Sequence, residues 1–313
     1  MISSISYLVP KFIKNHLFNP VSYRILVFQL NGIFVSDIHG AIPKYHRLFQ
    51  VIRTEQPDAV FLGGDLLPLR PTQQRIMEEF IEHTILSEIK KIYHERDKKI
   101  RFFLIMGNDD PRIFEQIFIT GEKAGCLQYV NQKTVRYKRT YVTGYSFVPP
   151  TPFQLKDWER YDVSRFIDVG AISPEQGRRT IPVSPDVMKY STMAEDLEAL
   201  SKQSPARQTI YLFHSPPYQS CLDTADLHEK KVDHAPLDIH VGSIAIQRFI
   251  KEQQPLLTLH GHVHESPRIT GCWKEKVGKT YSFTAAHDGP ELAVVRFETE
   301  HLQDATRELI PVT

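Results

Sequence analysis

The chain has 313 residues, and a hydrophobic content of 41% allows a substantial core in one large domain or two small ones. The formal net charge of +1 excludes a global electrostatic attraction to nucleic acid or to an anionic membrane, and no apolar run reaches the roughly 18 residues that a membrane span needs. No secretion signal is found, because Pro10, Lys11 and Lys14 interrupt the apolar N-terminal stretch. Cys126, Cys221 and Cys272 lie far apart and form no disulfide framework, so we expect a reducing compartment and a cytoplasmic protein.

The first part of the chain alternates helices and strands. We expect residues 4–18 to form a helix packed on the domain, with an amphipathic arm for a partner or a membrane as the alternative. Residues 24–36 predict a hairpin, because Asn31-Gly32 is typical of a tight turn. Periodicity then predicts helices at 43–55, 72–96 and 111–124 and strands at 58–63 and 101–106. This alternation indicates an α/β fold with parallel neighbouring strands.

After residue 126 the pattern changes. Residues 146–186 contain six prolines and predict an irregular insertion, either a lid that contacts the substrate or a solvated, poorly packed segment. Arg160, Arg165, Arg178 and Arg179 lie within it. A second irregular segment is expected at 215–241, and Ser243 is expected to cap the next helix. The remaining elements are helices at 187–202 and 244–253 and strands at 127–131, 134–138, 140–145, 208–213, 256–260, 268–273, 279–284 and 291–297. We predict a single domain over residues 1–313, since no repeat or linker is visible.

Five short polar patches directly follow apolar runs that indicate buried strands. In open α/β sheets, ligands bind beyond the carboxyl ends of the strands. Asp and His are the side chains that borderline divalent metals prefer, so the patches predict one cluster of metal ligands. The patches are Asp37-Ile38-His39, Gly63-Gly64-Asp65, Gly107-Asn108-Asp109-Asp110, His214 in His-Ser-Pro-Pro, and Gly261-His262-Val263-His264.

The number of candidate ligands favours two ions. A structural zinc site needs only four ligands and closes around them. Two ions about 3.5–4 Å apart hold the attacking and leaving oxygens of a phosphoryl displacement, and a bound water that loses its proton becomes the nucleophile. We therefore predict two divalent ions, with Mn, Fe, Zn and Ni as candidates. The predicted ligands are Asp37, His39, Asp65, Asn108, His214, His262 and His264.

The ordered set DIH, GGD, GND, HSPP and GHVH resembles the calcineurin-like metallophosphoesterases of the prokaryotic phosphoesterase type, over residues 33–264. The resemblance implies a four-layer α/β/β/α sandwich with two mixed sheets and a two-metal site. It also implies that Asp65 bridges the ions. By the same resemblance, the first ion is bound by Asp37, His39 and His264, and the second by Asn108, His214 and His262.

Asp109 stands where this family usually has a His that protonates the leaving oxygen or contacts the phosphate. An ordinary Asp is ionised at pH 7 and donates a proton only if burial or a nearby carboxylate, such as Asp110, raises its pKa. We therefore place Asn108, Asp109 and Asp110 in the candidate catalytic set. The alternatives are that His46, His240 or His287 supplies the proton, or that no protein acid is needed. Asp109-Asp110 before Pro111 could equally cap the next helix.

Other departures concern the substrate side. Residues 285–290 replace the Asn-Pro-Gly turn that the family often has. Gly242-Ser243 predicts either a plain helix cap, which we favour, or a phosphate site at a helix N-terminus. His228, His234 and His240 line either the substrate mouth or a solvated loop.

These observations lead to a functional expectation. We expect a dinuclear metal-dependent phosphoesterase that hydrolyses a phosphodiester, because some family members without the usual His are phosphodiesterases. A phosphomonoester is the second choice, and the substrate is a phosphorylated small molecule or another phosphodiester, with no specific nucleic-acid signal. The alternative is a weakly catalytic or non-catalytic metal-binding scaffold of the same fold.

Overall fold

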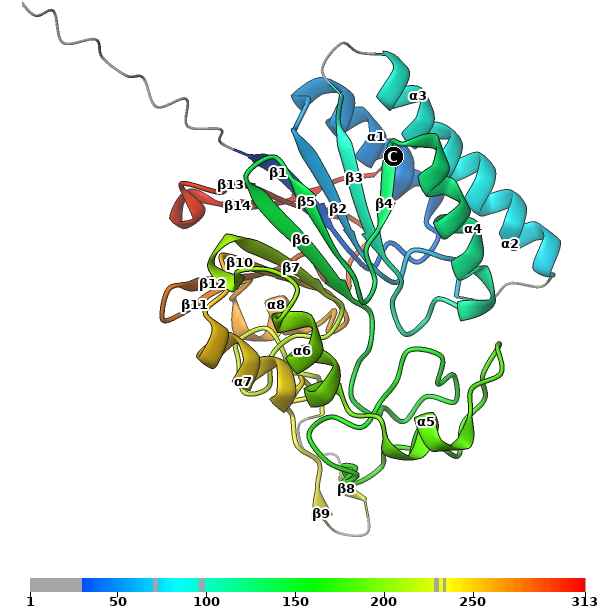
Figure 1. Cartoon of the computed structure of the whole chain (residues 1–313), viewed down its shortest axis with the longest axis vertical. Helices are drawn as coiled ribbons and strands as arrows, with labels where there is room; N and C mark the ends of the chain where they lie inside the picture. Colours follow the sequence, from blue (N-terminus) through cyan, green and yellow to red (C-terminus); the bar gives the residue numbers. More distant parts are fainter. Residues whose placement is uncertain (1–29, 70–72, 96–98, 228–230, 233–234, 313) are drawn as a thin grey trace, which may run out of the picture.

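A computed structural model describes residues 30–69, 73–95, 99–227, 231–232 and 235–312. Two six-stranded sheets pack face to face, and helices cover their outer faces (Figure 1). Apolar side chains from both sheets meet between them, where the ring of Phe283 lies 6.2 Å from that of Phe297. The predicted four-layer α/β/β/α sandwich with two mixed sheets is confirmed.

The first sheet has the strand order β14-β13-β1-β2-β3-β4. Its four strands from β1 to β4 are parallel, while β13 and β14 run antiparallel to their neighbours. The central strands are almost entirely buried, as expected for parallel strands that are covered on both faces. The strands are β1 (Asn31–Val35), β2 (Ala59–Gly63), β3 (Arg101–Ile105), β4 (Leu127–Tyr129), β13 (Leu292–Glu298) and β14 (Thr306–Ile310).

The second sheet has the strand order β11-β12-β10-β7-β6-β5. Its four inner strands are parallel, and the two edge strands are antiparallel to them. A small antiparallel pair, β8 (Lys231–Val232) and β9 (Ala235–Pro236), stands apart from it. The sheet consists of β5 (Thr134–Tyr137), β6 (Thr140–Tyr145), β7 (Thr209–Phe213), β10 (Leu257–His260), β11 (Lys274–Val277) and β12 (Thr280–Thr284).

Helices from the first half of the chain cover the first sheet, and α6 and α7 cover the second (Figure 1). A π-helical segment, Ile81–Leu86, joins α2 and α3, so one long helix is present as predicted, although residues 72 and 96 lie outside the described part. In the described ranges, no helix is long and apolar enough to cross a membrane. The helices are α1 (Ile42–Glu55), α2 (Gln74–Phe80), α3 (Ser87–Glu95), α4 (Glu115–Gly121), α5 (Pro185–Tyr190), α6 (Met193–Ser201), α7 (Ile244–Gln253) and α8 (Ser266–Thr270).

The expected tight turn at Asn31-Gly32 is wrong. Both residues belong to β1 and pair with Glu298 and Phe297 of β13. A Cβ atom on Gly32 would lie 2.4 Å from the ring of Phe297, so this glycine makes room for an aromatic ring of the core. Residues 24–29 of the predicted hairpin and residues 4–18 lie outside the described residues.

Two elements in the second half of the chain also differ from expectation. The strand predicted at 268–273 is wrong, because residues 266–270 form α8 and the nearby strand β11 begins only at Lys274. This helix has Pro267 in its first turn and ends at Gly271, whose φ of 68° suits a helix end. The helix predicted at 187–202 is divided into α5 and α6, because Thr192 forms a capping box that starts a new helix.

The insertion at residues 146–186 is irregular, as its prolines predict, but it is well packed. Lys156 and Trp158 are 0% exposed, and Asp157 and Glu159 are 1% exposed. Lys156 and Glu159 form a buried ion pair. The interpretation as a solvated, poorly packed segment is therefore wrong.

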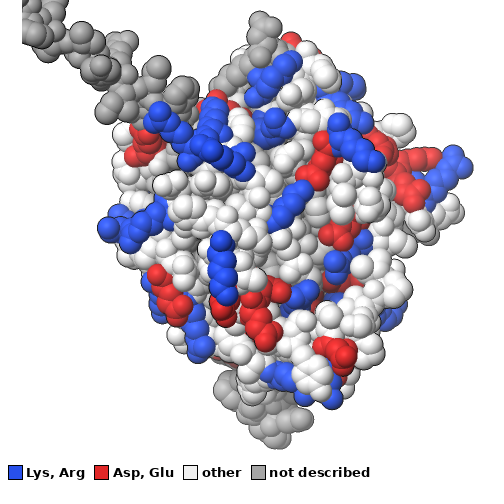
Figure 2. Space-filling model, viewed as in Figure 1, with Lys and Arg blue, Asp and Glu red and all other residues white. Residues whose placement is uncertain are grey.

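Three of the four arginines in the insertion have partners within the fold. Arg160 pairs with Asp196, and Arg165 pairs with Glu175. Arg179 donates to two main-chain carbonyl groups, while Arg178 is exposed. On the face shown in Figure 2, acidic and basic side chains are interspersed over most of the surface, which agrees with the small net charge.

Cys221 and Cys272 form a disulfide, which corrects the expectation of three unpaired cysteines. The bond joins the loop after β7 to the residue that follows Gly271, across a sequence separation of 51. Cys126 is free and buried. Since distant cysteines give no local signal of pairing, only the folded chain reveals this one. The pairing removes the argument for a reducing compartment that rested on unpaired cysteines.

Candidate metal centre

Each of the five polar patches follows the carboxyl end of a strand. β1, β2 and β3 are parallel neighbours in the first sheet, and β7 and β10 are parallel neighbours in the second. Because the sheets pack face to face, their strand ends bring the patches together, as expected for α/β folds. Asp37 and His39 follow β1, Asp65 follows β2, Asn108 follows β3, His214 follows β7, and His262 and His264 follow β10.

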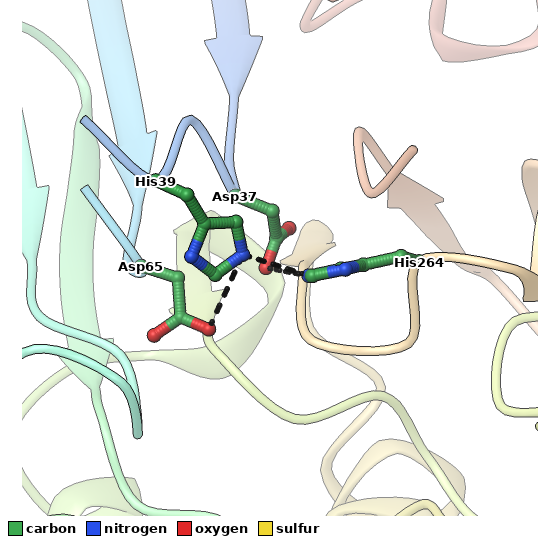
Figure 3. Close-up of side chains that lie close together, drawn as sticks. All are labelled: Asp37, His39, Asp65 and His264. Atoms are coloured by element: carbon green, nitrogen blue, oxygen red, sulfur yellow. Dashed lines mark hydrogen bonds and ion pairs between the residues drawn. The ribbon is translucent and has the colours of Figure 1, made fainter. Parts of the chain in front are cut away.

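Four of the predicted ligands converge at one point (Figure 3). One ligand atom from each of Asp37, His39, Asp65 and His264 lies within 4.8 Å of the others. The Nε2 atom of His39 is 3.1 Å from Nε2 of His264, which in turn is 3.2 Å from Oδ1 of Asp37. Nitrogen and carboxylate atoms that face one another in this way are suited to a shared cation.

The other three predicted ligands lie beside this group, on the far side of Asp65. The Nε2 atom of His214 is 3.3 Å from Oδ2 of Asp65 and 3.0 Å from Oδ1 of Asn108. The same Asp65 oxygen lies 4.0 Å from Nε2 of His39. The ring of His262 is 5.2 Å from that of His214. Asp65 therefore stands between the two groups of ligands.

The backbone of the centre is strained. Asp37, His39, Asp65 and His262 have φ values of 55°, 47°, 52° and 75°, a region that non-glycine residues rarely adopt. Such conformations cluster at functional sites, where the surrounding structure enforces them. The strain at four of the seven predicted ligands thus supports a functional role.

Two glycines allow the ligand loops to approach one another. Gly64 has a φ of 92°, and a Cβ on it would lie 2.7 Å from Nδ1 of His214. A Cβ on Gly107 would lie 2.2 Å from Oδ1 of Asp65. Any larger residue at either position would push the loops apart, so glycine is needed for the close approach.

The unpartnered atoms of the centre fit a metal ion. Oδ2 of Asp37 is buried and has no hydrogen-bond partner among the described residues. Nδ1 of His214 donates to the carbonyl of Gly63 at 2.8 Å, which leaves its Nε2 atom to bind a metal. Buried polar atoms without partners are costly, and a coordinated cation would satisfy them.

The charged side chains of the centre shift one another's pKa values. Burial, together with the charge of His214, lowers the pKa of His262 to about 3. Burial acts in the same direction on His214, but the carboxylates of Asp65 and Asp37 outweigh it and raise the pKa of His214 to about 10. Burial opposes ionisation of Asp37, yet the hydrogen bond and charge of His264 lower its pKa. The centre thus consists of ionisable side chains that strongly shift one another's pKa values, as is common at functional sites.

Asp109 lies at the edge of the centre, with its side chain 32% exposed. Its carboxylate accepts a hydrogen bond from Asn108 at 3.1 Å and lies 4.0 Å from Nδ1 of His39. Its N–H donates to Oδ1 of Asp65 at 2.8 Å. Burial, and then the charge of Asp65, raises the pKa of Asp109 to about 7. Its role in proton transfer stays a prediction.

Asp110 has a different environment from Asp109. Its side chain is fully buried and accepts hydrogen bonds from the N–H groups of Leu66, Leu67 and Gly107. These contacts join the loop after β2 to the loop after β3. The arrangement supports a structural role for Asp110, and its inclusion among the catalytic residues stays a prediction that no contact supports.

The alternative proton donors make other contacts. His46 is exposed on α1, Nδ1 of His240 lies 2.8 Å from Asp223, and Nε2 of His287 lies 2.9 Å from Glu291. No hydrogen bond or ion pair within the described ranges joins these three histidines to the seven predicted ligands. His228 and His234 lie outside the described residues.

The N-terminus of α7 is already occupied by a carboxylate. Ser243 caps the helix by accepting from the N–H of Ile246, as predicted. Asp162 of the insertion accepts from the N–H groups of Ile244 and Ala245 and from the Ser243 hydroxyl. The phosphate site considered at Gly242-Ser243 is therefore wrong, because Asp162 takes the position of an anion.

One contact close to the centre was not predicted from the sequence. The indole N–H of Trp158, in the insertion, donates to the carbonyl of Asp110 at 2.8 Å. The signal for this contact in the sequence is Trp158 itself, because a large aromatic residue in an irregular segment is usually packed against the rest of the fold.

Comparisons with known proteins agree with this geometry. The family model for calcineurin-like phosphoesterases matches residues 33–266. The protein TT1561 of Thermus thermophilus has 14% sequence identity and a TM-score of 0.53, with 90% of this chain and 99% of that chain covered. A dimetal phosphatase from Danio rerio has 10% identity and a TM-score of 0.53, with 91% and 99% covered. At these identities the two structures show a common fold. No curated protein sequence matched the chain.

Proposed function

The chain belongs to the calcineurin-like phosphoesterases, and from that premise we propose that it is a dinuclear metal-dependent enzyme that hydrolyses a phosphodiester. The family implies a phosphate ester as substrate. The number of ions, the catalytic activity and the diester preference are parts of the proposal.

The position of Asp65 carries the proposal of two ions. One of its oxygens lies 4.0 Å from Nε2 of His39 and 3.3 Å from Nε2 of His214, so that a carboxylate stands between two sets of imidazoles. Carboxylates can bridge paired metal ions in this way. We assign Asp37, His39 and His264 to the first ion, Asn108, His214 and His262 to the second, and Asp65 to both.

The side chains of the centre have distinct tasks in this proposal. When bound, the divalent ions polarise the phosphoryl oxygens and make a water-derived nucleophile available near neutral pH. The N–H of Asp109 orients Asp65. The Asp109 carboxyl, at the exposed edge, is the proposed proton donor to the leaving oxygen.

The residue at position 109 supports a diester over a monoester. Asp109 stands where the family usually has a His, and its carboxylate lies 4.0 Å from Nδ1 of His39 at the exposed edge of the centre. A phosphomonoester carries one more negative charge than a diester near neutral pH, so the Asp109 carboxylate, when ionised, repels a monoester more strongly.

A comparison of two chromogenic esters tests the proposal. The protein is treated with a chelator, reloaded with Mn²⁺, Ni²⁺ or Zn²⁺, and assayed with bis-p-nitrophenyl phosphate and p-nitrophenyl phosphate. We expect a higher kcat/KM for the diester. The reverse preference would identify a monoesterase, and no turnover of either ester with metal bound would favour a scaffold of the same fold.

A further inference from the structure

The insertion at residues 146–186 contacts the turn that carries Asn108 and Asp109. The central contact is the hydrogen bond from the Trp158 indole to the carbonyl of Asp110, which is 2.8 Å long and buried. Trp158 is itself 0% exposed and packs against Phe147 with a ring distance of 5.5 Å. The hydrogen bond of the indole N–H and the packing of the ring against Phe147 together fix the position of Trp158.

A second set of contacts holds the residues just after the turn. Asp157 accepts a hydrogen bond from the N–H of Arg112 at 2.8 Å, and Thr180 accepts one from the N–H of Ile113 at 3.0 Å. The guanidinium of Arg112 lies 4.9 Å from the centre of the Trp158 ring. These N–H groups begin the helical segment after Pro111, so the insertion caps it.

The turn transmits this restraint to the predicted ligands. The Asp110 carboxylate accepts from Gly107 in its own turn and from Leu66 and Leu67 in the loop that follows Asp65. Within the turn, Oδ1 of Asn108 lies 3.0 Å from Nε2 of His214. A continuous series of contacts thus leads from Trp158 through Asp110 to the Asn108 side of the centre.

We propose that Trp158 and Asp157 are positioning residues for the second metal ion, an inference that rests on the proposed function. They fix the turn from Gly107 to Asp110, so that the side-chain oxygen of Asn108 is aimed at the ion. The ligands that serve the first ion alone, Asp37, His39 and His264, lie on other loops, and within the described ranges no hydrogen bond or ion pair joins them to the insertion. The insertion therefore affects the two ions unequally.

The expected effect is a selective loss of metal affinity. Residues that orient metal ligands typically change affinity by roughly 10–100-fold when they are altered. In Trp158→Phe the ring remains, but the N–H that holds the Asp110 carbonyl is lost. We expect roughly 10-fold weaker binding of the second ion, at the low end of that range. The change for the first ion should be smaller, because only Asp65, which serves both ions, links it to the turn.

The chain offers a matched control, since it contains two tryptophans. Trp273 packs against Phe283 at a ring distance of 5.7 Å, and its indole N–H has no hydrogen-bond partner in the described part of the chain. Trp273→Phe removes an indole without touching the turn from Gly107 to Asp110. It should bind both ions as the wild type does.

The test is a Mn²⁺ titration of the chelator-treated full-length protein, followed by electron paramagnetic resonance. Wild type and Trp273→Phe should bind two ions and lose the six-line signal of isolated Mn²⁺ as coupled pairs form. Trp158→Phe should retain the six-line signal at two equivalents and lose it only at higher Mn²⁺. Asp157→Asn should change in the same direction, and it replaces Trp158→Phe if that variant does not fold.

The outcomes separate the two claims. If the wild type forms no coupled pair, the proposed function fails, and this inference fails with it. If the wild type forms the pair and Trp158→Phe forms it with equal affinity, the inference alone is overturned. Equal weakening of both ions, in step with a lower melting temperature, would also overturn it, because a general loss of stability predicts no selectivity.

Discussion

The Oδ2 atom of Asp65 lies 3.3 Å from the Nε2 atom of His214, although the two residues follow strands of different sheets. Asp65 comes at the end of β2 and His214 at the end of β7, so their contact exists only when the sheets are packed together. A metal ion held by both would bind the folded chain and not the unfolded one. Metal binding and the packing of the sandwich should therefore be linked.

Metal loading should stabilise the protein. A ligand that binds only the folded state at 100 times its Kd adds about 2.7 kcal/mol to the free energy of unfolding. We expect at least this increase when Mn²⁺ is added to chelator-treated protein, measured by urea unfolding. The variant Asp65→Ala/His262→Ala should show no increase. An equal increase in that variant would mean that the metal binds elsewhere.

Replacing Asp109 should affect poor leaving groups most. Asp109→Asn keeps the size of the side chain but cannot donate a carboxyl proton. Since acid catalysis contributes roughly 10²-fold or more when the leaving oxygen is poor, hydrolysis of diphenyl phosphate should slow by about that factor. Hydrolysis of bis-p-nitrophenyl phosphate should change much less. Equal slowing of both esters would argue against Asp109 as the proton donor.

Asp110 should matter for stability. Asp110→Ala leaves three buried N–H groups, of Leu66, Leu67 and Gly107, without their acceptor. Each buried donor without a partner costs about 1–3 kcal/mol, so the free energy of unfolding should fall by about 3 kcal/mol or more. Asp110→Asn keeps one acceptor oxygen and should lose less. Both values are measured in chelator, and similar losses in the two variants would contradict this role.

Glu159 should give the protein a pH-dependent stability. Burial raises the pKa of Glu159 from 4.5 to about 7, although the charge of Lys156 opposes the shift. A carboxyl whose pKa is raised by folding stabilises the fold fully below about pH 4.5 and loses that contribution as the pH rises through 7. The loss amounts to about 3 kcal/mol, since each pKa unit corresponds to about 1.4 kcal/mol.

Glu159→Gln tests this dependence because it cannot titrate. Relative to the wild type, its free energy of unfolding should rise by about 2 kcal/mol between pH 5 and pH 7.5, which is most of the full change. Glu175→Gln, which changes a less buried glutamate of the same insertion, is the control and should follow the wild type. Parallel pH curves for wild type and Glu159→Gln would show that Glu159 titrates normally.

The sequence predicted the strands and the α/β fold because their signals are local, whereas the four-layer sandwich followed from the resemblance to the family. Apolar runs such as 59–63 and 209–213 are short and bounded by polar residues, and the structure contains strands at both. The ligands were found for a related reason. Each follows such a run directly, so that the topology of parallel strands brings Asp37, Asp65 and His214 to one end of the sheets.

Most of the failures concern contacts between distant parts of the chain. The insertion is an exception, because Lys156 and Glu159 lie three residues apart and their ion pair allows both to be buried. Gly32 resembled a turn residue because nothing near it in sequence reveals the ring of Phe297. Asp162 occupies the start of α7 from a position 82 residues before Ile244, and no local pattern could indicate this partner.

The most direct test of the central claim is the rate of bis-p-nitrophenyl phosphate hydrolysis as Mn²⁺ is added stepwise to chelator-treated protein. If two ions form the catalytic centre and Asp65 bridges them, the rate should remain low with the first equivalent, rise with the second and then level off. Asp65→Ala/His262→Ala should stay inactive at every addition. A wild-type rate that remains at the level of buffer with two ions bound, or an equal rate in the double variant, would contradict the account.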